Sequence, residues 1–317
     1  MNAPTIPIID LAGSFSGDAA ARRTTAGEID RACRAVGFFY VRNHGIPEAL
    51  IAGQFGAARD FFALGEAEKR GYPQGLRPGY EPLEGQKFDP NAPGDLKEGF
   101  TIGIERGPEH KLVKAGVPRH GANQWPAGLP AFRTQSEAYF QAAHRLGLHI
   151  MGLVALALDL PESYFAPFFD DPSVSLRMLH YPPHPADAPA RQLGCGAHTD
   201  WGSITILAQD GAGGLELQTA AGDWIKALPI PGTFVVNLGD LLARWTNDLY
   251  RSTPHRVINN LSGRDRYSLA LFLDPHYDAR IECLPSCRSA ENPPRYRTCT
   301  AGEHNTEMYR RTHGQAA

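Results

Sequence analysis

The sequence predicts a mainly β protein with flanking helices, in which short strands form a barrel or jelly roll. The first observation is that the chain from residue 174 onward contains seven short strand-like segments, separated by glycine-rich turns such as residues 210–214. The second is that residues 1–170 carry helical patterns and loops instead. The third is one long helical pattern over residues 129–158, closed by Pro161, which we expect to back the sheet.

The N-terminal half, residues 1–170, is predicted to alternate short strands with helices before a long loop region. Apolar residues recur at helical spacing before Gly37, which ends the first helix. Residues 71–128 are rich in Gly and Pro, so loops are expected to dominate there. The predicted elements before the long helix are a strand at residues 6–11, a helix at 20–36, a strand at 38–41, a helix at about 48–64 and a strand near 97–104.

The C-terminal half is predicted to hold most of the jelly-roll core, within residues 174–280. A short helical piece is expected at residues 241–245, and the capping box Thr300-x-x-Glu303 opens a C-terminal helix at residues 300–314. No internal repeat, linker or low-complexity run divides the chain, so we expect a single domain over residues 1–317. The predicted strands are residues 176–181, 203–208, 215–218, 224–227, 233–238, 255–259 and 267–274.

Composition argues against several classes of partner. A formal net charge of −3 gives no general attraction to phosphate backbones or anionic lipid, so we expect neither a nucleic-acid nor a membrane partner. The five cysteines are odd in number and contain no C-x-x-C, which argues against a disulfide framework and favours a cytoplasmic protein. The N-terminus has no basic segment followed by an apolar run. We expect a monomer or weak homo-oligomer.

The stretch around His198-Thr199-Asp200 indicates a metal site. On a strand, side chains two residues apart point to the same face, so His198 and Asp200 can bind one ion. His255, 55 residues after Asp200, supplies a third ligand. Two His and one carboxylate leave three open positions on a six-coordinate metal, the arrangement of non-heme Fe(II) oxygenases. We therefore expect these three residues to be the catalytic metal ligands.

Two further sequence features bear on this assignment. Arg266-Tyr267-Ser268 follows His255 by 11 residues, and strand alternation places Arg266 and Ser268 on one face, where they can bind a carboxylate. A second His-x-Asp, His276-Tyr277-Asp278, serves as an internal control, because only His304 and His313 follow it and neither precedes an Arg-x-Ser.

These features resemble the isopenicillin N synthase-like branch of the Fe(II)/2-oxoglutarate-dependent oxygenases. The similar stretches are residues 6–11, residues 37–46, Tyr181-Pro182-Pro183 and Arg266-x-Ser268. The resemblance implies a double-stranded β-helix, a cupin-like jelly roll, with Fe(II) as cofactor, 2-oxoglutarate as cosubstrate and O2. It implies that decarboxylation of 2-oxoglutarate to succinate and CO2 drives C–H oxidation of a small-molecule substrate. Hydroxylation, desaturation and cyclisation all stay open.

The resemblance also assigns roles to individual residues. Tyr181 matches a tyrosine that supports the cosubstrate bound by Arg266 and Ser268. Four residues are expected near the primary substrate, with anchoring of the long loop region as the alternative role: Tyr80, Phe88, Lys97 and Phe100. His44 lies in a family-like stretch but outside the ligand spacing, so we expect it to be structural, and Cys195 receives no role.

Three alternatives accompany this hypothesis. The nearest is a 2-oxoglutarate-independent Fe(II) oxidase of the isopenicillin N synthase or aminocyclopropane-carboxylate oxidase type, because Arg-x-Ser indicates a carboxylate and not which one. A zinc hydrolase could use two His, a carboxylate and a water, but it leaves Arg266 and Ser268 unexplained. A non-catalytic cupin-like binding module would hold metal or ligand without turnover, and the intact set of three ligands argues against it.

Overall fold

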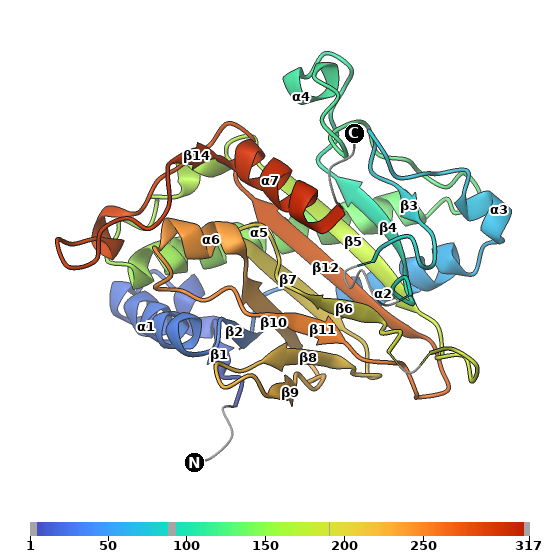
Figure 1. Ribbon diagram of the computed structural model, residues 1–317, viewed down its shortest axis with the longest axis horizontal. Helices are drawn as coiled ribbons and strands as arrows, with labels where there is room; N and C mark the ends of the chain where they lie inside the picture. Colours follow the sequence, from blue (N-terminus) through green and yellow to red (C-terminus); the bar gives the residue numbers. More distant parts are fainter. Residues whose placement is uncertain (1–4, 88–92, 190, 314–317) are drawn as a thin grey trace.

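Two β-sheets face each other in the computed structural model of the protein, which describes residues 5–87, 93–189 and 191–313 (Figure 1). The larger sheet is mostly antiparallel and has eight strands. Their order is β1 (Ile8–Asp10), β2 (Phe38–Arg42), β10 (Thr233–Leu238), β7 (Ile204–Gln209), β12 (Arg266–Asp274), β5 (Ser173–Tyr181), β4 (Glu98–Gly103) and β3 (Tyr80–Glu81).

The smaller sheet lies in front of the larger one in Figure 1 and has four antiparallel strands. Their order is β6 (Cys195–His198), β11 (His255–Val257), β8 (Leu215–Gln218) and β9 (Trp224–Lys226). A separate two-stranded ladder joins β13 (Arg280–Ile281) to β14 (Cys299–Thr300).

Helices cover the face of the larger sheet that points away from the smaller one (Figure 1). The long helix α5 approaches β12 so closely at Gly147 that a Cβ there would lie 2.9 Å from a methyl carbon of Leu273. The α-helices are α1 (Ala19–Ala35), α2 (Glu48–Phe62), α3 (Glu66–Lys69), α4 (Lys111–Lys114), α5 (Phe132–Ala157), α6 (Asp240–Trp245) and α7 (Ala301–His313). Three 3-10 turns are Ala12–Phe15, Ala166–Phe169 and Pro285–Cys287.

Side-chain alternation along β12 divides the interior into two layers. Leu269, Leu271 and Leu273 point into the core between the larger sheet and the helices, which runs from Ile9 to Ala301 in sequence. Arg266 and Ser268 point to the opposite face, toward the smaller sheet. There a second apolar cluster, including Tyr181 and Val257, fills part of the space between the sheets. The remainder of that space is the cavity described below.

The predicted fold class is confirmed, and most predicted elements are present with ends shifted by a few residues. Residues 215–218 and 233–238 form strands over the predicted ranges. The capping box also forms, because the Thr300 N–H donates to Glu303 Oε2 at 2.8 Å and the Glu303 N–H to Thr300 Oγ1 at 3.1 Å. Strand β3, helices α3 and α4 and the β13–β14 ladder were not predicted. All are four residues or shorter, too short to show a hydrophobic period.

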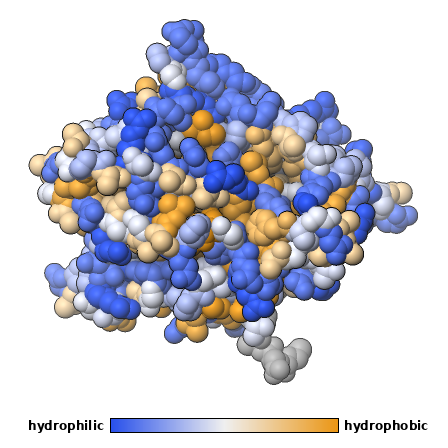
Figure 2. Space-filling view, turned by 180° about the vertical axis from the view of Figure 1, so that it is seen from behind, coloured by the Kyte–Doolittle hydropathy of each residue, from blue (hydrophilic) through white to orange (hydrophobic). Residues whose placement is uncertain are grey.

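Polar and apolar residues are interspersed on the face seen from behind (Figure 2). Large apolar side chains that are at least partly exposed include Leu148 of α5, Ile8 and Phe15. Among the described residues, no helix is both long and apolar enough to cross a membrane. The predicted monomer or weak homo-oligomer stays a prediction.

Candidate active site

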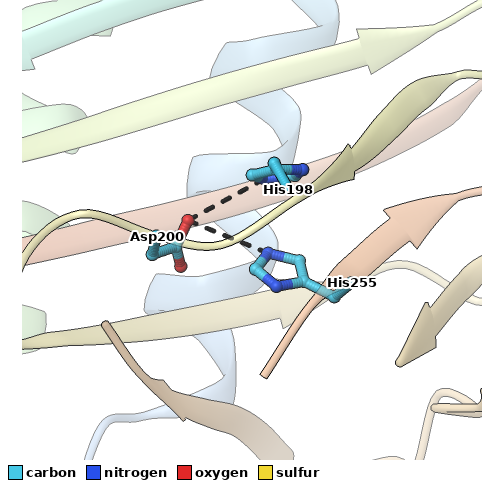
Figure 3. A group of neighbouring side chains, drawn as sticks. All are labelled: His198, Asp200 and His255. Carbon is cyan, nitrogen blue, oxygen red and sulfur yellow. Dashed lines mark ion pairs between the residues drawn. The ribbon is translucent and has the colours of Figure 1, made fainter. Parts of the chain in front are cut away.

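The three predicted metal ligands converge between the two sheets (Figure 3). His198 is the last residue of β6 and His255 the first of β11, and the two are direct partners across the antiparallel ladder. The Nε2 atoms of both histidines lie 3.8 Å from Oδ1 of Asp200. Within the described part of the chain, no other group of three His, Cys, Asp or Glu residues is placed to hold a metal. The second His-x-Asp forms no such group, and its Asp278 instead pairs with Lys111 at 2.6 Å.

Backbone carbonyls orient both imidazoles. His198 Nδ1 donates to the carbonyl of Gly196 at 2.8 Å, and His255 Nδ1 donates to the carbonyl of Thr253 at 3.2 Å. A carbonyl can only accept, so these contacts place the proton of each neutral ring on Nδ1. The lone pair of each Nε2 is thus directed toward Asp200 and available to a metal.

A cross-strand pair orients the carboxylate of Asp200. Thr205 on β7 and Asn237 on β10 are direct partners in the larger sheet. Thr205 Oγ1 and Asn237 Nδ2 both donate to Oδ2 of Asp200, each at 2.6 Å. Because Oδ2 is occupied by two donors, Oδ1 faces the two histidines. Such supporting hydrogen bonds fix the direction of a metal ligand.

Burial and mutual charge set the protonation of the three ligands. Burial lowers the pKa of His198, and burial together with His198 lowers the pKa of His255 to about 4. Burial acts to raise the pKa of Asp200, but His255, His198 and the hydrogen bonds from Thr205 and Asn237 outweigh it and lower that pKa. At neutral pH the site therefore presents two neutral imidazoles and one carboxylate. A metal can bind this set without displacing protons.

The backbone at Asp200 differs from the sequence-based expectation. We expected Asp200 to share a strand with His198, but β6 ends at His198 and Asp200 lies in the loop that follows. The Asp240 N–H, at the start of α6, donates to the Asp200 carbonyl at 2.7 Å. That carbonyl is then engaged by α6 instead of by a neighbouring strand. Gly239 permits this approach, since a Cβ there would lie 2.2 Å from the Gly202 carbonyl oxygen. The predicted convergence of His198 and Asp200 nevertheless holds.

Arg266 and Ser268 lie side by side on the cavity face of β12 and are almost fully buried, with 2% and 1% exposure. Arg266 Nε donates to the carbonyl of Gly213, and the guanidinium lies 4.4 Å above the ring of Tyr181, its partner on β5. Among the described residues, Nη1 of Arg266 has no hydrogen-bond partner despite its burial. A buried, unpaired guanidinium nitrogen beside a hydroxyl fits a bound carboxylate.

A cavity of about 450 Å³ connects the candidate carboxylate site, formed by Arg266 and Ser268 and called here the Arg266 seat, with the three metal ligands. Its walls come from both sheets, from the loop at residues 117–120 and from α7. His304 of α7 fixes that helix to the loop carrying Asp200, because its Nε2 donates to the Trp201 carbonyl at 2.9 Å. With this volume, the cavity has room for more than the metal and one small acid.

Comparison with known proteins matches this geometry to one family. Residues 6–128 match the model of the non-haem dioxygenase in morphine synthesis N-terminal region, and residues 172–275 match that of the 2OG-Fe(II) oxygenase superfamily. The 2-oxoglutarate-Fe(II) type oxidoreductase hxnY of Emericella nidulans is 39% identical over 99% of this chain and 92% of its own. The chain belongs to the 2OG-Fe(II) oxygenase superfamily.

Other relatives of this oxygenase are similar over nearly their whole length. The structure of a full-length Neurospora crassa protein in complex with alpha-KG and thymine has a TM-score of 0.86 and 32% identity, covering 97% of each chain. Homoarginine-6-hydroxylase 2-ODD-C23 of Glycine max is 35% identical over 88% of this chain and 86% of its own. The predicted family and its cofactors, Fe(II) and 2-oxoglutarate with O2, are confirmed. The 2-oxoglutarate-independent oxidase is not favoured.

Of the residues expected near the substrate of this oxygenase, one lines the cavity and two do not. Lys97 lines the cavity, donating to Asp95 Oδ2 at 2.7 Å and to Cys195 Sγ at 2.9 Å. Tyr80 and Phe100 do not line it. Tyr80 is buried and bonds Glu98 at 2.5 Å, and Phe100 packs on Phe61 in the helix-side core, so both positions fit the alternative role of anchoring.

Phe88 lies outside the described residues. His44 is buried and its ring lies 4.4 Å from that of Phe234, a packing contact in keeping with a structural role. Burial raises the pKa of Cys195 to about 11, so its side chain is a neutral thiol at physiological pH.

The supporting residues Thr205 and Asn237 were not predicted as site residues. Both lie on predicted strands, and nothing local in sequence marks them. Their role arises only from the pairing of β7 with β10. The sequence of β7 offers a weak signal, because Thr205 is a polar residue between Ile204 and Ile206.

Replacing Asn237 by Ala is expected to weaken Fe(II) binding by roughly 10- to 100-fold, the usual effect of losing a residue that orients a metal ligand. The Asp200 carboxylate would lose one of its two Oδ2 donors and gain rotational freedom. Anaerobic calorimetric titration with Fe(II) measures the effect. Asn292→Ala, which removes a side-chain amide that donates to the Cys287 carbonyl, is the matched control. Unchanged iron affinity in Asn237→Ala would contradict this role.

Proposed function

We propose that this oxygenase binds Fe(II) through His198, Asp200 and His255 and binds 2-oxoglutarate through Arg266, Ser268 and Tyr181. The observation that carries the assignment is the unpaired, buried Nη1 of Arg266, in the same cavity as the three ligands. When bound, Fe(II) and 2-oxoglutarate supply the oxidising chemistry, in which decarboxylation provides two of the four electrons that reduce O2 and substrate C–H oxidation the other two.

The chain's own residues position both partners of that reaction. Arg266 donates to the distal carboxylate of the cosubstrate. The Gly213 carbonyl and the ring of Tyr181 fix the orientation of the planar Arg266 guanidinium. The hydroxyl of Ser268, on the same face of β12, adds a second donor. The histidines keep their protons on Nδ1 throughout, because both Nδ1 atoms donate to fixed carbonyls.

The primary substrate is proposed to be a small molecule, in keeping with the size of the cavity and the absence of a general positive charge. Hydroxylation, desaturation and cyclisation are all compatible with this site. A cytoplasmic location is proposed from the five cysteines, all of which are free and buried.

Release of CO2 from 2-oxoglutarate tests the proposed function. Fe(II) protein prepared without oxygen is mixed with carboxyl-labelled 2-oxoglutarate, O2 is admitted, and labelled CO2 is counted against His255→Ala. We expect slow release without substrate and faster release when the primary substrate is added. No release above the control, alone and across a broad substrate panel, would favour an oxidase in which the substrate's own carboxylate occupies the Arg266 seat.

A further inference from the structure

The cavity has two distinct ends, set by the register of β5 and β12. Arg266 is paired with Tyr181 at one end, and Asp274 is paired with Ser173 at the other. Eight residues separate Arg266 from Asp274, roughly 26 Å at about 3.3 Å per residue of strand. Thr205, which holds the metal ligand Asp200, is paired with Phe272, near the second end. If 2-oxoglutarate spans from Arg266 to the metal, the space toward Asp274 is left for the primary substrate.

A guanidinium lies at this second end: Arg119, on the loop at residues 117–120, lines the cavity and is near enough to Asp274 for the charge of that carboxylate to act on it. All four residues of the loop line the cavity. His120 fixes the loop to the start of β5, since its Nδ1 donates to the Pro118 carbonyl at 2.8 Å and its Nε2 accepts from the Ser173 hydroxyl at 3.2 Å. The Arg119 N–H donates to the Gly75 carbonyl at 2.9 Å. The loop is therefore held from both sides.

The backbone of Arg119 is in the left-handed region, with φ of 62°. A side chain other than Gly, Asn or Asp is uncommon there, so the position of Arg119 is imposed by its surroundings and not by local preference. Arg119 is an exposed residue and lines the cavity. Surrounding protein atoms nevertheless lower the pKa of the guanidinium by burial, an effect that the negative charge of Asp274 opposes.

Among the described residues, Arg119 forms no ion pair with a carboxylate, unlike most other cationic side chains on the cavity wall. Asp274 is near enough for its charge to act on Arg119, but it forms no ion pair with it, and its Oδ1 accepts the Ser203 N–H at 3.0 Å. Three other wall cations are neutralised by carboxylates, namely Lys97 by Asp95, Arg106 by Asp171 and Arg177 by Glu81.

Arg266 is the other wall cation without a carboxylate partner, and its partner is proposed to be the cosubstrate. The same logic applies at the opposite end. We propose that Arg119 binds a carboxylate of the primary substrate, which is therefore an organic acid. A single guanidinium suits the one negative charge of a planar carboxylate, whereas a phosphate dianion would call for further unpaired cations. The apolar side chains of Val117 and Phe272 line the space where the carbon skeleton would lie.

This inference rests on the proposed function, and a binding experiment separates the two. The protein is loaded with Fe(II) and 2-oxoglutarate under nitrogen and titrated calorimetrically with hexanoate, 4-phenylbutyrate and cinnamate. Each acid is paired with its neutral primary amide. We expect at least one acid to bind and its amide to bind at least 10-fold more weakly. Arg119→Gln is expected to weaken binding of that acid by roughly 10- to 100-fold, the usual effect of losing a charged hydrogen bond.

Three further variants complete the experiment. Arg119→Lys should retain part of the affinity, because the charge persists without the planar fork. Lys114→Gln, on the neighbouring α4 and ion-paired only to the exposed Glu109, should leave acid binding unchanged. Arg266→Gln should lose 2-oxoglutarate binding, whereas Arg119→Gln should keep it.

Each outcome bears on one proposal. Absence of 2-oxoglutarate binding to the wild-type protein would refute the proposed function. If 2-oxoglutarate binds but the amides bind as tightly as the acids, no acid binds, or Arg119→Gln binds them unchanged, the assignment of Arg119 is wrong. A lower melting temperature of ligand-free Arg119→Gln and Arg119→Lys, without a selective loss of acid binding, would likewise overturn it and assign the residue to stabilising Asp274.

Discussion

Asp200→Ala is expected to abolish Fe(II) binding at neutral pH and, with it, all oxidation of substrate. The carboxylate is the only negative ligand of the site, and its Oδ1 lies 3.8 Å from Nε2 of both His198 and His255. Two neutral imidazoles alone, without an anionic third ligand, hold Fe(II) weakly. The variant also leaves the buried donors of Thr205 and Asn237 without their acceptor, which costs about 1–3 kcal/mol of unfolding free energy for each donor.

Anaerobic titration with Fe(II), together with a thermal unfolding curve, measures both effects. Asp200→Asn retains an acceptor for Thr205 and Asn237, so it should fold normally and still fail to bind iron. Asp278→Ala is the matched control, because Asp278 belongs to the second His-x-Asp and pairs with Lys111 on the surface. It should bind iron like the wild-type protein. Full activity in Asp200→Ala would show that the ligand assignment is wrong.

Arg266→Ala is expected to weaken 2-oxoglutarate binding by roughly 30- to 4000-fold. Removing one partner of a desolvated charge pair costs on the order of 2–5 kcal/mol, and 1.4 kcal/mol corresponds to a tenfold change in affinity. The large value applies here because Arg266 is 2% exposed and its Nη1 has no partner within the described structure. Fe(II) affinity should change little, since Arg266 is not a ligand.

Titration of the Fe(II)-loaded variant with 2-oxoglutarate under nitrogen gives the affinity directly. Arg264→Ala provides the control, as Arg264 precedes β12 by two residues, is exposed, and its guanidinium donates to the Gly211 carbonyl at 3.3 Å. Equal 2-oxoglutarate affinity in Arg266→Ala and the wild-type protein would remove Arg266 from the cosubstrate seat.

The chemistry of the centre could be predicted from sequence because it depends on local alternation and on few residues. Arg266 and Ser268 share a face on any strand, and the structure places both on the cavity side of β12. His198 and His255 are far apart in sequence, yet residue type and spacing sufficed to pair them, and they are direct neighbours across β6 and β11.

Other parts of the site could not be predicted, because they depend on contacts between distant elements. Asp200 leaves the strand through a hydrogen bond from Asp240, 40 residues later. Thr205 and Asn237 meet only through sheet pairing. Tyr80 and Phe100 are aromatic residues in a loop-rich region far from the metal ligands in sequence, and their side chains lie in the core behind the sheet. Sequence could not give the direction of their side chains, and neither residue lines the cavity.

The two faces of strand β12 limit which insertions and deletions this oxygenase can accept in evolution. It is paired along its length with β5 and for six residues with β7, and one face carries Arg266 and Ser268 while the other packs on the helices. Deleting or inserting a single residue between Arg266 and Leu269 would reverse the facing of one relative to the other, so that Arg266 would point to the apolar core or Leu269 to the cavity. We therefore expect β12 to tolerate no length variation, whereas the loop carrying Arg119 can gain or lose residues. Substrate preference can then diverge while the oxidising centre keeps its dimensions.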